Sequence, residues 1–142
     1  MLQRLSERYD QYIQQSQAVR DEAPLLSGFL GFGSDPRNDP CHKNFFRDVE
    51  KWKQQFVASD PEEEQVYAAV KLMLEAPVGK REHDSYWFLF AAQGLCRELI
   101  PMLNRQHCQE LAEFYDREFP KRDRLDAQAA VYKALVRGAK GK

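Results

Sequence analysis

The chain has 142 residues, of which 43% are hydrophobic, 12% aromatic and 30% charged, and its formal net charge is −1. This length fits one domain, and the hydrophobic fraction is too high for a disordered chain. A net charge close to zero argues against a non-specific nucleic-acid surface, which needs an excess of basic residues.

The cysteines and the apolar runs indicate the compartment. Three cysteines cannot all pair within one chain, and residues 1–20 lack the apolar core of a signal peptide. The longest apolar run, residues 86–92, is far shorter than the roughly 20 residues of a membrane-spanning helix. We therefore expect a reduced, cytoplasmic protein with no membrane partner.

Residues 1–20 predict an amphipathic helix, because apolar side chains recur every three or four positions. We expect Pro24 to end this helix or to remain outside it. Such a helix packs on its own domain by default. The alternative is an obligate homo-oligomer in which the first helix completes a partner's core. The stripe consists of Leu2, Leu5, Tyr9, Tyr12, Ile13, Ser16 and Val19.

Residues 24–39 predict an irregular loop, and the stretch 27–46 differs most from an amphipathic helix. It contains three glycines and two Asp-Pro pairs among large apolar side chains. Side chains as apolar as Phe29, Leu30 and Phe32 must lie against something. They fill the end of the bundle, line a pocket or bind a partner.

Residues 40–138 predict a helical core. Asp39 and Asp60 each precede a proline, so each is expected to cap a helix, and Glu63 is placed for a capping box. Asn104 is a further expected cap, and Gly138 an expected helix end. Residues 86–100 are apolar on nearly all sides, which predicts a central buried helix with Trp87 in the core.

These elements predict an all-α, single-domain bundle of about six helices in antiparallel hairpins, with a long apolar loop after the first helix. A short α-solenoid is the alternative, because residues 63–74 and 125–136 share an amphipathic pattern. Residues 139–142 predict a flexible basic tail.

Two doublets, Cys41-His42 and His107-Cys108, contain residue types that bind zinc. Their spacing does not favour a site, because structural zinc ligands usually come in pairs two to four residues apart. The start of a helix favours a thiolate at Cys41, whereas the carboxylate of Asp39 opposes it.

The sequence therefore predicts a non-catalytic interaction or binding domain with no cofactor, whose partner is a protein or a second copy of the chain. The rival hypothesis is a thiol- or metal-dependent enzyme, or a zinc site, centred on Cys41, His42 and His107, with Cys108 as a further ligand. The candidate binding residues all lie in the stretch 27–46 and are Phe29, Leu30, Phe32, Asp35, Asp39, Cys41 and His42.

Overall fold

The computed structural model describes residues 1–30, 39–83 and 85–141, and for 22–30 it describes the backbone. In this part of the chain there are six α-helices and no strand, so the predicted all-α bundle is confirmed. The α-helices are α1 (Leu2–Leu30), α2 (Pro40–Ala58), α3 (Glu63–Glu75), α4 (Tyr86–Ala92), α5 (Arg105–Glu118) and α6 (Asp126–Ala139). The short 3₁₀ helices are η2 (Gln93–Glu98) and η3 (Ile100–Met102), which follow α4, and η4 (Lys121–Asp123), which precedes α6.

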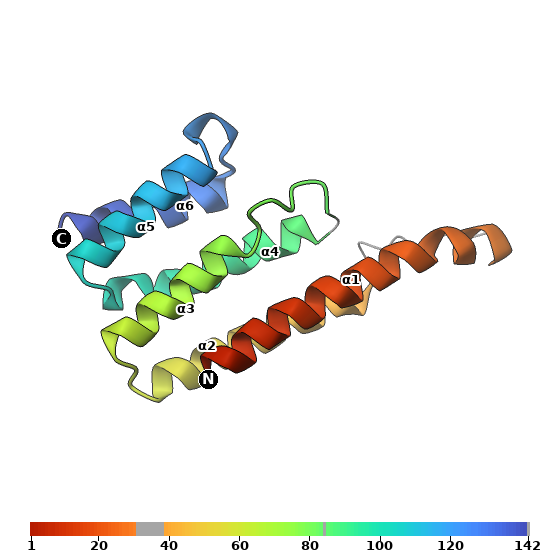
Figure 1. The fold of residues 1–142 in the computed structure, drawn as a ribbon, viewed down its shortest axis with the longest axis horizontal. Coiled ribbons are helices and arrows are strands. Elements are labelled where there is room, and N and C mark those ends of the chain that lie inside the picture. Colours follow the sequence, from red (N-terminus) through yellow and green to blue (C-terminus); the bar gives the residue numbers. More distant parts are fainter. Residues whose placement is uncertain (31–38, 84, 142) are drawn as a thin grey trace.

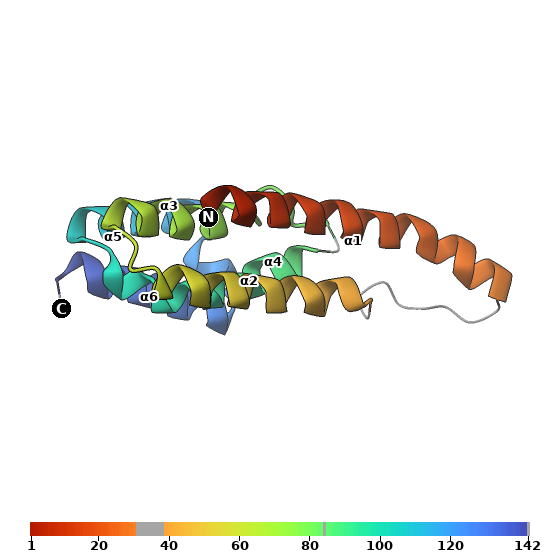
Figure 2. The same cartoon turned by 90° about the horizontal axis from the view of Figure 1, so that it is seen from below.

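Consecutive helices run antiparallel, α1 with α2, α3 with α4 and α5 with α6 (Figure 1). The view from below shows two layers, one of α1, α3 and α5 and the other of α2, α4 and α6 (Figure 2). The alternative of a short α-solenoid stays a prediction, and the observed order of helices is compatible with it.

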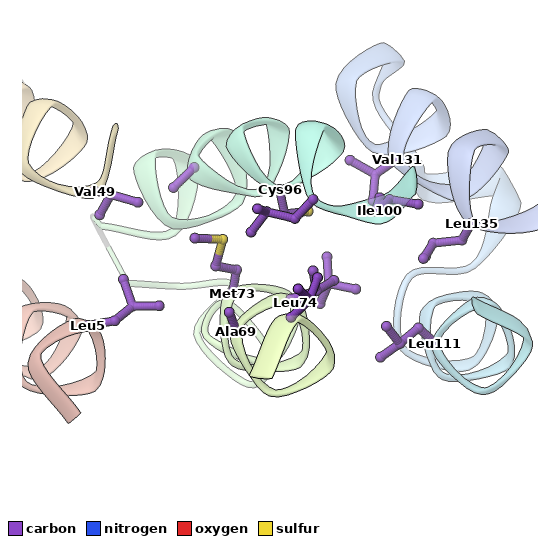
Figure 3. Packing of buried hydrophobic residues seen from close by; sticks show 14 of the residues in the cluster. Leu5, Val49, Ala69, Met73, Leu74, Cys96, Ile100, Leu111, Val131 and Leu135 are labelled. Atoms are coloured by element: carbon purple, nitrogen blue, oxygen red, sulfur yellow. The ribbon is translucent and has the colours of Figure 1, made fainter. Parts of the chain in front are cut away.

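The hydrophobic core lies between the two layers (Figure 3). One cluster of buried side chains includes residues from all six α-helices, from Leu5 in α1 to Leu135 in α6. The stripe of α1 is part of it, since Leu5, Tyr9 and Tyr12 are at most 3% exposed. This part of α1 is therefore covered by its own chain, and the oligomer through the first helix stays a prediction.

The first helix is longer than the sequence predicts. It continues from the expected end at residue 20 through Pro24 to Leu30, so the predicted loop is wrong for residues 24–30. Proline lacks a backbone N–H, but its φ near −65° fits a helix, and Ala23, Leu25 and Leu26 are strong helix formers. Residues 31–38, with the predictions for Phe32 and Asp35, lie outside the described residues.

The third helix begins at Glu63 rather than at Pro61. Its N-cap is Glu62, whose N–H donates to the side-chain oxygen of Gln65 at 3.0 Å. Asp60 has a φ of 55°, a left-handed conformation that Asp adopts more readily than most residues. Asp60 therefore forms the turn after α2, and the predicted cap at this residue is wrong.

The predicted central helix 86–100 is divided, and only part of it is buried. The α-helix ends at Ala92, and the chain continues as η2 and η3. Leu89 is fully buried, but Trp87 is 55% exposed, so the prediction that Trp87 lies in the core is wrong. A helix in one layer of a two-layer molecule has a solvent side, and Trp87 lies about 200° around the helix from Leu89.

A buried amide lies where α4 passes into η2. The Gln93 side chain donates from Nε2 to the carbonyl oxygen of Leu74 at 3.3 Å and accepts from the Tyr115 hydroxyl at 2.8 Å. The last four carbonyls of a helix have no partner within it, and Leu74 is in the last turn of α3. One side chain thus satisfies the end of α3 and links it to α5.

Gly138 is not the end of α6, contrary to the prediction. The helix continues to Ala139, and Gly141, with a φ of 73°, follows it. A Cβ atom on Gly138 would collide with the sulfur of Cys108 and lie 3.2 Å from its Cβ. Glycine is required here because α6 packs closely on α5.

We expect Gly138→Ala to lower the free energy of unfolding by about 1–3 kcal/mol, because the added methyl group overpacks the contact with Cys108. Gly94→Ala is the matched control, since no atom lies within 4 Å of the added Cβ. In a helical segment this change should leave stability unchanged or raise it by up to about 1 kcal/mol. Urea denaturation measures both, and equal effects of the two variants would contradict the close contact.

Candidate functional site

The start of α2 holds three of the predicted site residues. Asp39 caps the helix as predicted, and its Oδ1 accepts a hydrogen bond from the N–H of Cys41 at 2.9 Å. Pro40 follows at the first helical position. In these contacts Asp39 caps the start of α2. Phe29 and Leu30 belong to the last turn of α1, whose described part is the backbone.

The thiol of Cys41 is partly exposed and is a poor nucleophile. Its pKa is raised to about 11, mainly because burial disfavours the thiolate, and further because the thiol interacts with the carboxylate of Asp39. Arg8 acts in the opposite direction with a smaller effect. A thiol enzyme needs a lowered pKa, so the surroundings of Cys41 disfavour that hypothesis.

His42 is a core residue at 2% exposure. Its Nδ1 lies 2.7 Å from the hydroxyl of Tyr12, and its ring stacks on Phe88 with the ring centres 4.1 Å apart. Burial raises the pKa of Tyr12 far above its ordinary value, so the hydroxyl stays protonated in this contact. His42 thus connects α1, α2 and α4.

The four predicted zinc ligands do not come together. Cys41 and His42 lie at the start of α2, whereas His107 and Cys108 lie at the start of α5, and these two helices begin far apart along the long axis of the molecule (Figure 1). Within residues 1–30, 39–83 and 85–141, one group of three or more possible ligand atoms lies within 4.8 Å of one another, and it is Glu63, Glu64 and His107.

In that group, Glu63 joins the starts of α3 and α5. Both of its carboxylate oxygens lie 2.8 Å from Nδ1 of His107, and Oε2 also accepts from the N–H of Asn104 at 2.8 Å. The His107 ring stacks on Tyr67 with the ring centres 3.8 Å apart. A carboxylate near two helix N-termini is electrostatically favourable, so these contacts have a structural explanation. A cation would have to displace the hydrogen bond between His107 and Glu63.

Ser85 and His83 form a pair that resembles a nucleophile and its base. The Ser85 hydroxyl lies 2.6 Å from Nδ1 of His83, whose Nε2 lies 3.0 Å from the side-chain oxygen of Gln17. However, Ser85 is 0% exposed, so no substrate reaches its hydroxyl in this conformation. The pair fixes the start of α4 against α1.

The most exposed large apolar side chain in the described residues is Trp87, at 55%. Together with Leu125, which is 44% exposed, it lines a hollow of about 320 Å³. The Trp87 ring packs against Tyr86 and Phe90, with ring centres 5.7 and 5.1 Å away. The remaining lining residues are Arg81, Tyr86, Asp123 and Gln128.

A second hollow, of about 460 Å³, lies between η2–η3 and the end of α6. Its lining includes the buried Ile100 and two exposed arginines, Arg97 and Arg137. The complete lining is Gly94, Arg97, Glu98, Ile100, Pro101, Ala134, Arg137 and Gly138.

Both hollows belong to one surface. The segment α4–η2–η3 and helix α6 run side by side in the same direction (Figure 1), so their starts meet at the first hollow and their ends at the second. Trp87, Ala91, Gly94 and Arg97 are all exposed and follow one another at helical spacing. We call this surface the α4–α6 seam: the residues that line the two hollows, with Ala91 and Ala130 between them.

Sequence reasoning missed this surface because it assigned Trp87 to the core. The angle between Trp87 and Leu89 was the available signal, since a helix with any solvent side cannot bury both. Which of the two faces outward depends on contacts with distant helices.

Comparison of the chain with models of known families, with curated proteins and with solved structures finds no match. None of the described helices combines the length and the hydrophobicity that crossing a membrane requires.

We expect the alkylation of Cys41 by iodoacetamide to be slow at pH 7 and to accelerate with a midpoint near the pKa of about 11. Asp39→Asn should move this midpoint to lower pH, because it removes the charge that disfavours the thiolate and keeps a capping oxygen. Mass spectrometry of the labelled peptide measures both rates and separates Cys41 from the two buried cysteines. Rapid labelling at pH 7 would contradict the raised pKa.

Proposed function

We propose that this chain is a non-catalytic protein-binding domain and that its partner binds along the α4–α6 seam, with Trp87 as the main contact residue. The observation that carries the proposal is the exposure of Trp87 in a hollow that also contains Leu125 and Arg81. Tryptophan, tyrosine and arginine are the residues that contribute most often to binding energy at protein interfaces.

The energetic gain from covering Trp87 is large enough to matter. A tryptophan side chain buries 150–250 Å² when it is fully covered, and about half of Trp87 is exposed, so a partner would bury about 100 Å² more. At about 25 cal/mol per Å², this contributes about 2–3 kcal/mol. The rings of Tyr86 and Phe90 hold Trp87 in place, which reduces the entropy lost on binding.

The described contacts of the stretch 27–46 support a different role from the one that the sequence predicts. Asp39 caps α2, Cys41 follows it, and His42 is buried between helices. These contacts give Asp39 and His42 structural roles, and binding by Cys41 stays a prediction. Binding by Phe29, Leu30 and Phe32 stays a prediction, and the α4–α6 seam is the surface that the described residues favour.

A selection of random peptides of about fifteen residues on the immobilised protein tests the proposal. We expect Trp87→Ala to weaken the binding of the selected peptides by at least about 30-fold in fluorescence polarisation, the effect of losing about 2 kcal/mol. Val57→Ala is the control, because Val57 is 39% exposed and lies on α2 outside the seam.

The same variant should fold normally. Because Trp87 is largely exposed, Trp87→Ala should change the free energy of unfolding by less than about 1 kcal/mol. A normal stability together with lost binding identifies a contact residue. Peptide binding that is equal in the Trp87→Ala and Val57→Ala variants would refute the proposal.

A further inference from the structure

The α4–α6 seam differs in charge between its two ends, and we infer that the partner segment is acidic: an apolar side chain contacts Trp87, and carboxylates farther along bind between Arg97 and Arg137. This inference rests on the proposed function and adds the chemical class of the partner.

The second hollow has an excess of positive charge. Its lining contains two arginines and one acidic residue, Glu98. The carboxylate of Glu98 lies 3.0 Å from Nζ of Lys53, whose side chain is 6% exposed and therefore held in place. Lys53 thus neutralises Glu98, and the charges of Arg97 and Arg137 remain available.

The neighbouring part of α6 extends this positive surface. After Asp126, the charged residues of α6 and of its C-cap are Lys133, Arg137 and Lys140, with no acidic residue among them. A cleft lined by charges of one sign attracts ligands of the opposite sign and raises their association rates. Guanidinium groups also bind carboxylates through two parallel hydrogen bonds, which gives geometric specificity.

The middle of the seam allows a peptide backbone to lie close to the surface. The residues along it are small: Ala91 and Ala130 between the hollows, and Gly94 and Ala134 in the lining of the second hollow. From Trp87 to Arg97 the chain rises about 17 Å, from the rise per residue of α- and 3₁₀ helices. The same distance spans about five residues of an extended peptide or about eleven of a helix.

Nucleic acid is the other anionic polymer that tryptophan and arginine can bind. The seam favours a peptide, because the lining of its basic hollow includes the apolar Ile100, Pro101 and Ala134, whereas nucleic acid is bound through a series of phosphate contacts. An apolar residue followed by a few carboxylates fits both hollows.

The test repeats the peptide selection on a charge-reversed protein, Arg97→Glu with Arg137→Glu. We expect peptides selected on the original protein to contain Asp or Glu about five or eleven residues from an apolar residue, and to bind the reversed protein at least about 10-fold more weakly. Peptides selected on the reversed protein should have Lys or Arg at that spacing and keep the apolar residue. Arg4→Glu with Lys51→Glu is the control, since it changes the net charge equally on α1 and α2.

The outcomes separate this inference from the proposed function. If binding depends on Trp87 but both selections give the same charge composition, the acidic partner is refuted and the binding domain stands. If binding does not depend on Trp87, the proposed function itself fails. If labelled oligothymidylate binds more tightly than the selected peptides and loses binding in the reversed protein, the ligand class is nucleic acid and the inference is overturned.

Discussion

The arrangement of the hairpins depends on one buried amide. The Gln93 side chain accepts a hydrogen bond from the Tyr115 hydroxyl in α5 and donates one to the carbonyl of Leu74 in the last turn of α3. It therefore joins the second and third hairpins inside the core. Without it, a carbonyl and a hydroxyl would be buried with no partner, at a cost of about 1–3 kcal/mol each. Gln93 faces inward at the first position of η2, directly after α4, while Trp87 six residues earlier faces solvent. The buried contact of Gln93 and the surface proposed for binding therefore lie on different sides of the continuous segment α4–η2.

The sequence predicts well those features that depend on neighbouring residues. The helical fold, the cap of α2 by Asp39 and the cap of α5 by Asn104 follow from local patterns, and the structure has them. The errors concern features that distant contacts decide. Whether Trp87 or Leu89 faces the core depends on α2 and α3, and the pair of Glu63 and His107 joins residues 44 positions apart. For the same reason the two hollows of the α4–α6 seam, which combine segments about 40 residues apart, leave no local pattern in the sequence.

The residues that suggested chemistry in the sequence are occupied by structural contacts. His42 lies between a tyrosine and a phenylalanine, and His107 lies between Tyr67 and Glu63. Each contact satisfies polar atoms that would otherwise be costly to bury. A histidine or cysteine in a helical sequence therefore has two explanations, a chemical role or a structural one. The burial of its neighbours in the folded protein decides between them.

The parallel course of α4–η3 and α6 has a further consequence, because these segments belong to different hairpins (Figure 1). The seam exists only while the third hairpin is docked on the second. A bound segment that contacts both would hold them together, so binding and local opening become thermodynamically linked. The amide protons of α5 and α6 would then exchange with solvent more slowly in the complex, even where they lie far from the ligand.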